Sequence, residues 1–145
     1  MEFTGLEVQR DGVRVQPFLP RDAEGVLDAV VESGADLSRY ETWSEPPFTI
    51  DNAKEYVRWW TEGWEERTAF FFAVTDTADF LGACGIFDLQ PGPSGSMGYW
   101  VRSAQTGHGL ATDVASLVAH WGFQNLGLTF IDLQVSDSNP ASVRV

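Results

Sequence analysis

The stretch from residue 97 to residue 135 constrains the fold most, because a strand pattern passes through closely spaced glycines into a helix and then into a second strand. MGYWVR (97–102) predicts the first strand and TFIDLQV (129–135) predicts the second. Gly107 and Gly109 precede the helix, whose predicted inner face carries Leu110, Val114, Leu117, Val118 and Trp121. Strands joined in this way run parallel with a right-handed crossover. We therefore expect one parallel strand pair with a glycine loop at the turn into the helix.

The segments upstream predict three further strands and two helices. Strands are expected at 13–18, 69–75 and 80–88, and helices at 21–33, stopped by Gly34, and after the N-cap residue Thr49. Loops are expected at 35–48 and 90–96, where proline or glycine interrupts any period. The expected fold is mixed α/β (α+β): one domain over residues 1–145, with a mainly antiparallel central sheet, helices on both faces and one parallel pair around the glycine loop.

Charge and composition exclude several classes of function. The net charge is −12 and only nine basic residues are spread along the chain, whereas binding to a nucleic-acid backbone needs several clustered Lys or Arg residues. No apolar run reaches the length of a membrane span. An acidic surface favours a cationic partner, and solubility alone is the alternative explanation. The single cysteine, Cys84, points to a reducing cytoplasm and is interpreted as a small buried thiol; no His/Cys cluster predicts a metal site.

The glycine loop has the features of a phosphate site. Glycine permits positive φ angles and a close approach of the backbone to a ligand, and the first amides of a helix lack partners within it. A tight turn without a ligand is the alternative. A Walker loop is excluded because Lys54 is the only lysine, and the dinucleotide fingerprint fails because Thr112 stands where its third glycine would be.

Several separated motifs keep a common order around this loop. A GYW strand, the G-x-G-x-A-T loop, a helix that ends F-x-x-L-G-L, a strand and the segment N-x-A-S-x-R-V follow one another up to Val145. In this order the chain resembles the GNAT N-acetyltransferases, and within them the RimJ/RimL-type branch. Upstream, VQPFLPRDAEGV and the W-x-E-P-P loop agree more loosely.

The resemblance implies that acetyl-CoA is the co-substrate and indicates where it binds. The pantetheine arm would pair with the backbone at 100–102 and the pyrophosphate would lie on the amides at 107–112. The residues assigned to the cofactor are Trp100, Val101, Arg102, Thr106, Gly107, His108, Gly109, Leu110, Ala111, Thr112, Asn139 and Ser142. Arg102 and His108 are the only nearby sources of positive charge. For Asn139 and Ser142, a turn and a helix cap are alternative roles.

The chain departs from the family pattern at three places. Thr106 replaces the usual Arg or Gln before the first loop glycine, and Ser96 stands where the family often has a glutamate, so a familiar candidate base is missing. The family continues into two more strands, so we expect a C-terminally incomplete domain. The strand at 129–135 would then expose an edge, and a homodimer is an open alternative.

Candidate catalytic residues are Asp88 and Asp132 as the base and Ser136 as the donor of a proton to the thiolate, with the expected missing C-terminal part as the alternative source of that donor. Alternation along the last strand favours a solvent-facing Asp132 as the simpler interpretation. The acceptor would contact Trp43, Glu45 and Trp59, since an aromatic ring and a carboxylate suit a cationic amine; local packing of a proline-rich loop is the alternative.

The sequence therefore predicts a cytoplasmic enzyme that transfers an acetyl group from acetyl-CoA to a primary amine by direct attack. The acceptor would be a protein N-terminus, such as that of a ribosomal protein, or a small amine. Two alternatives remain open: a non-catalytic acyl-CoA-binding module of the same fold, and a nucleotide-binding domain that uses the same loop.

Overall fold

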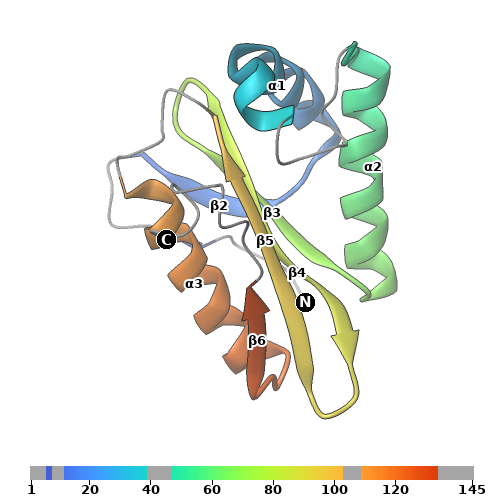
Figure 1. Ribbon diagram of the computed structural model, residues 1–145, viewed down its shortest axis with the longest axis vertical. Coiled ribbons are helices and arrows are strands. Elements are labelled where there is room, and N and C mark those ends of the chain that lie inside the picture. Colours follow the sequence, from blue (N-terminus) through green and yellow to red (C-terminus); the bar gives the residue numbers. More distant parts are fainter. Residues whose placement is uncertain (1–5, 8–11, 39–46, 103–108, 134–145) are drawn as a thin grey trace.

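The computed structural model describes residues 6–7, 12–38, 47–102 and 109–133. Within them a six-stranded sheet has the order β1-β2-β3-β4-β5-β6. Its strands are β1 (Leu6–Glu7), β2 (Arg14–Pro17), β3 (Phe70–Thr75), β4 (Phe80–Gln90), β5 (Ser94–Val101) and β6 (Phe130–Leu133). The α-helices are α1 (Ala23–Ser38), which follows a short 3₁₀ turn (Pro20–Asp22), α2 (Ile50–Glu66) and α3 (Leu110–Asn125). Helices α1 and α2 lie on one face of the sheet and α3 on the other (Figure 1).

The sheet confirms the predicted fold class. Neighbouring strands from β1 to β5 pair antiparallel, and β5 pairs with β6 in parallel. Helix α3 makes the crossover between these last two strands, as the strand–helix–strand pattern predicts. The turn into α3 therefore lies at the end of β5, where the phosphate site is expected.

Two boundaries and one additional strand differ from the prediction. Helix α1 continues to Ser38 across a kink at Gly34, whose φ of 48° and ψ of −127° interrupt the helix without ending it, so residues 35–38 are helical and not loop. The predicted loop 90–96 is a short turn, because Gln90 pairs with Ser94 and the β4–β5 ladder continues almost to its tip. The two-residue strand β1 was not expected; its length is below what periodicity detects.

Helix α2 begins as predicted. The Thr49 hydroxyl accepts a hydrogen bond from the Asn52 amide at 3.3 Å, and the Asn52 side chain accepts one from the Thr49 amide at 2.9 Å. This reciprocal pair satisfies two amides that the first turn leaves without partners. The cap thus sets where α2 starts.

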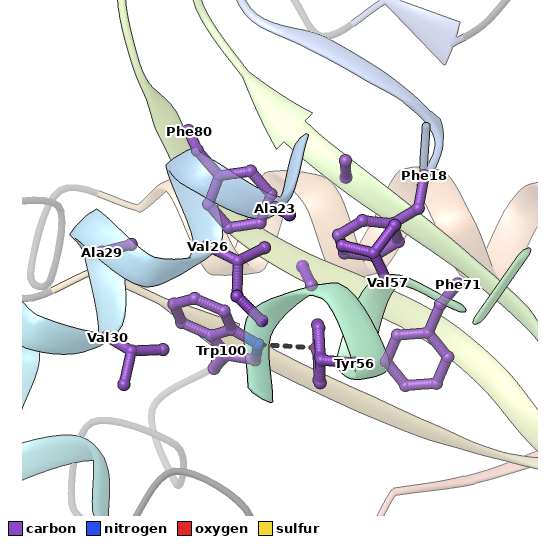
Figure 2. Packing of buried hydrophobic residues seen from close by; sticks show 13 residues of the cluster. Phe18, Ala23, Val26, Ala29, Val30, Tyr56, Val57, Phe71, Phe80 and Trp100 are labelled. Carbon is purple, nitrogen blue, oxygen red and sulfur yellow. Dashed lines mark hydrogen bonds between the residues drawn. The ribbon is translucent and has the colours of Figure 1, made fainter. Parts of the chain in front are cut away.

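Two hydrophobic clusters cover the two faces of the sheet. The α1/α2 cluster includes Val26, Tyr56, Phe71 and Trp100, and the Trp100 indole Nε1 donates a hydrogen bond to the Tyr56 hydroxyl at 3.0 Å (Figure 2). Trp60 stacks on Phe71 with ring centroids 3.9 Å apart. The cluster under α3 includes Phe72, Ile86, Val114 and Val118. Strand β5 is therefore supported from both faces along its length.

Candidate functional site

The far end of β5 presents backbone groups on its β6 side. Pairing with β6 covers Ser94 to Met97, while β5 itself continues to Val101. The Arg102 amide donates to the Leu81 carbonyl on β4 at 2.8 Å. Because backbone groups alternate along an antiparallel ladder, the peptide groups of Val101 and Tyr99 point away from β4. Val101 lies beyond Met97, the last residue of β5 in the described β5–β6 ladder, so an extended ligand can pair with its backbone.

This geometry separates the three predicted backbone contacts. Val101 faces the edge where the pantetheine arm is expected. Trp100 and Arg102 point their peptide groups toward β4, where the Arg102 amide is already bonded to Leu81. The Trp100 side chain lies in the α1/α2 cluster. Of the three, Val101 is the residue whose backbone can take part in an added strand.

Helix α3 starts with an unusual cap. Gly109 is its N-cap with φ 77° and ψ 2°, in the left-handed region, and glycine has no side chain with which to cap the helix. The first amides of α3, like those of every helix, lack intrahelical partners, and the helix dipole places partial positive charge there. Leu110 is buried against the sheet and fixes the position of this end, while Ala111 is half-buried and Thr112 is exposed. Among these residues the backbone, rather than a side chain, offers the anion site.

The Arg102 side chain points away from this edge and into α1. Its Nε donates to Glu32 and its Nη2 to Asp28, both at 2.8 Å, and its Nη1 donates to the Phe80 carbonyl at 2.9 Å. The hydrogen bond with Glu32 raises the pKa of Arg102 above its usual range, and the contact with Asp28 adds to the effect. The positive charge that the sequence assigned to a phosphate contact is thus neutralised by two carboxylates of α1.

Asp132 lies beside Ser96 in the parallel ladder. The register pairs these two residues, and the next pair, Met97 with Leu133, is the last one described. Met97 and Ile131 pack in the cluster under α3, so Ser96 and Asp132 project to the opposite face. Both side chains are half-buried. A carboxylate therefore stands next to the position where the sequence lacks the expected glutamate, and next to the edge of β5.

Asp88 occupies a bulge in β4. Its φ of 52° is rare for a residue other than glycine, and the register shifts between Phe87 and Gln90. Its exposed carboxylate accepts a hydrogen bond from the Gln90 side chain at 2.9 Å. Phe87 pairs with Ser96, so the bulge adjoins the same row across the sheet.

Of the three residues predicted to contact the acceptor, Trp59 lies in the described part of the chain. Trp59 lies on α2 off its buried stripe and is 48% exposed, with its ring centroid 6.5 Å from that of Tyr56. The other predicted residues outside the described part of the chain are Trp43, Glu45, Thr106, Gly107, His108, Ser136, Asn139 and Ser142. Their roles stay predictions.

The sequence analysis did not identify the residues that bind the side chains of Trp100 and Arg102 at the end of β5. Asp28 and Glu32 are four positions apart, which places both on one side of α1. Two carboxylates at this spacing, outside the apolar stripe of the helix, were the sequence signal that could have indicated a shared basic partner. Tyr56, which accepts the Trp100 hydrogen bond, carried no such signal because it reads as part of an ordinary apolar face.

Three other features bear on the chemistry. Among the described residues no cluster of His, Cys, Asp or Glu is suited to a metal ion. No described helix combines the length and the apolar character needed to cross a membrane. A surface hollow of about 320 Å³ lies at the opposite end of the sheet, beside the β4–β5 turn and the end of α3. It contains none of the residues predicted for the site.

Cys84 is fully buried in the cluster under α3, as the sequence predicts for a small structural thiol. Burial raises the pKa of its thiol far above the ordinary value. The thiolate needed for a covalent acyl intermediate is therefore strongly disfavoured.

We expect Cys84→Ala to keep acetyl-transfer activity within twofold of the wild type and to cost about 1 kcal/mol of unfolding free energy. Native protein should also react slowly with a thiol reagent, and urea-unfolded protein rapidly. Loss of turnover in a folded Cys84→Ala variant would argue instead for a covalent role.

Comparisons with known proteins find a family model and a relative that match most of this chain. The model of the "Acetyltransferase (GNAT) domain" family matches residues 13–145. The "Probable N-acetyltransferase YjcK" of Bacillus subtilis (strain 168) is 23% identical over 138 residues, which are 92% of this chain and 76% of that protein.

Two solved structures have a similar fold. The ribosomal-protein-S5-alanine acetyltransferase of Vibrio fischeri has a TM-score of 0.84 at 19% identity, over 98% of this chain and 79% of its own. RimJ of Mycobacterium smegmatis, solved in complex with CoA-disulfide, has a TM-score of 0.81 at 21% identity, over 97% of this chain and 70% of its own. At these identities the likenesses show a shared fold. The expectation of further C-terminal strands stays a prediction.

Proposed function

Because this chain belongs to the GNAT acetyltransferase family, we propose that it transfers the acetyl group of acetyl-CoA to a primary amine by direct attack. Membership of the family makes the chain an enzyme and acetyl-CoA its acetyl donor. The identity of the acceptor and the residues that act on it are the proposed part. The observation that carries the proposal is the position of Asp132, next to Ser96 and beside the open edge of β5.

The proposed path of acetyl-CoA follows from the direction of β5. The pyrophosphate lies on the amides of residues 107–112, at the start of α3, where oriented N–H groups hold an anion even in an acidic protein. The pantetheine arm runs back along β5 and pairs with the edge-facing backbone of Val101. This direction brings the thioester toward the row that contains Ser96 and Asp132.

The reaction needs a neutral amine and a polarised carbonyl. The Asp132 carboxylate accepts a proton from the ammonium form of the acceptor, directly or through a water molecule. The amine nitrogen then bonds to the thioester carbon, and an edge-facing N–H of β5 near Val101 stabilises the oxygen that becomes negative. The carbon–sulfur bond breaks, and the second proton of the amine passes through the hydroxyl of Ser136, the proposed relay, to the thiolate of CoA, which leaves as the thiol.

The acceptor proposed is an α-amino group of a protein or a small amine. An α-amino group titrates near pH 8, so a carboxylate is a sufficient base. The net charge of −12 favours a cationic acceptor, and the exposed ring of Trp59 offers a surface for it together with Trp43 and Glu45. The name of the similar Vibrio fischeri protein, a ribosomal-protein-S5-alanine acetyltransferase, refers to a protein acceptor. A cytoplasmic location and a homodimer stay predictions.

An acceptor panel tests the proposal. Release of CoA thiol is measured with basic and acidic peptides that have a free N-terminus, with the same peptides blocked at the N-terminus, and with small polyamines. We expect turnover with free amines and a preference for basic acceptors. Binding of acetyl-CoA by calorimetry without turnover on any amine would instead support the non-catalytic module. Stronger binding of ATP or NAD than of CoA would support the nucleotide-binding alternative.

Asp132→Asn should lower kcat by about a hundredfold, because it removes the carboxylate that takes the proton while keeping its shape. The affinity for acetyl-CoA should stay within twofold, since the change does not touch the backbone edge. Asp88→Asn tests the competing base in the same assay, and Glu65→Gln, an exposed change on α2, is the matched control. If Asp88→Asn shows the large loss and Asp132→Asn does not, the base assignment moves to the bulge.

A further inference from the structure

Arg102 is the last described residue before the glycine loop, and the bonds that it makes are unusual for a strand end. The residue is 6% exposed, although it carries a full charge and closes a strand at the rim of the sheet. Both its main chain and its side chain bind the first residues of β4: its amide donates to Leu81, and its Nη1 donates to the Phe80 carbonyl. Two hydrogen bonds of Arg102 thus connect the end of β5 to the first two residues of β4.

The guanidinium also attaches this point to α1. Its Nε and Nη2 reach Glu32 and Asp28, whose side chains remain 39% and 68% exposed, at 2.8 Å each. The planar guanidinium has donors in fixed directions. Its bonds to Glu32, Asp28 and the Phe80 carbonyl together define the position and rotation of the side chain. A single residue therefore connects α1, the start of β4 and the end of β5. We call this set of contacts the Arg102 anchor.

The anchor adjoins the part of β5 to which the proposed function assigns the pantetheine arm, and the inference rests on that assignment. Val101 directly precedes Arg102 and presents its peptide groups to the edge, with a described ladder partner on the β4 side only. A strand end held from one side loses order easily, and a ligand that binds a disordered edge must supply the free energy of ordering it. The anchor supplies that order before the ligand arrives.

We propose that Arg102 is a positioning residue for acetyl-CoA, which acts without touching the cofactor by holding the Val101 edge and the exit of β5 in the geometry that binds it. Helix α1 thereby becomes part of the cofactor site through Asp28 and Glu32. The inference concerns binding of acetyl-CoA and is independent of which amine accepts the acetyl group.

The test compares Arg102→Met with a control that destabilises α1 without touching the anchor. Val26→Ala is that control, because Val26 is fully buried in the α1/α2 cluster. For each variant, calorimetry gives the Kd of acetyl-CoA and thermal unfolding gives Tm, both on the full chain. We expect Arg102→Met to raise the Kd at least tenfold and Arg102→Lys to raise it about threefold, because lysine cannot reproduce the fork. Val26→Ala should lower Tm and leave the Kd within twofold.

A steady-state measurement separates positioning from a general loss of structure. With a turnover acceptor, Arg102→Met should raise KM for acetyl-CoA at least tenfold and leave kcat within threefold at saturation. Glu32→Gln is the mild variant if Arg102→Met does not fold: it removes one charge, keeps the shape and should raise the Kd about threefold. The proposal is overturned if a folded Arg102→Met or, failing that, Glu32→Gln binds like the wild type, or if Val26→Ala weakens binding as much as the change at Arg102.

Discussion

Gly109→Val is expected to weaken the binding of acetyl-CoA by about a hundredfold while the protein remains folded. Gly109 caps α3 with φ 77° and ψ 2°, a conformation that β-branched residues very rarely adopt. Valine would rotate this residue out of the left-handed region and turn the first amides of α3 away from the phosphate. Binding must then restore the strained conformation, at a cost of about 1–3 kcal/mol. Titration calorimetry with CoA measures the loss.

Gly127→Val provides the matched control for this change. Gly127 also has a positive φ, 67°, and a Cβ there would meet no atom within 4 Å. It lies between α3 and β6, at the opposite end of the helix. We expect a similar decrease in unfolding free energy for both variants and an unchanged affinity for CoA in Gly127→Val. Equal CoA affinity in folded Gly109→Val and wild-type protein would remove the backbone phosphate site from the proposed mechanism.

Gly85→Ala is expected to lower the free energy of unfolding by about 3 kcal/mol. A Cβ at Gly85 would overlap the ring of Phe71, and it would lie 2.6 Å from the Phe71 Cα. Trp60 stacks on the same ring at 3.9 Å, which limits how far the ring can move. Strands β3 and β4 would have to separate under α2. Urea unfolding followed by tryptophan fluorescence measures the change.

Gly98→Ala tests the same ring from the neighbouring strand. Gly98 pairs with Gly85 across β4 and β5, but a Cβ there would lie 3.2 Å from the Phe87 ring and 3.6 Å from the Phe71 ring. Small side-chain shifts accommodate such contacts, so the expected cost is below about 1 kcal/mol. Equal stabilities of the two variants would show that the Phe71 ring is free to move aside.

Local signals in the sequence were sufficient for the elements around the site. The order strand, glycine loop, helix and strand determines the parallel β5–β6 pair, since a crossover of that length has one favoured hand. The Thr49 cap and the exposed position of Trp59 follow in the same way from capping chemistry and from the period of the helix. These features depend on neighbours within one or two turns, so their energies can be evaluated without the rest of the chain.

Only the tertiary structure decided which distant residues meet. Arg102 binds Glu32 and Asp28, which lie 70 and 74 positions away in the sequence. Its positive charge alone had suggested a contact with phosphate. Asp132 became the stronger candidate base through its register with Ser96. A slip of one residue in β6 would have turned the Asp132 side chain to the other face of the sheet. Register and partner choice depend on how whole faces pack against each other, and hydrophobic burial is non-directional, so no local pattern contains this information.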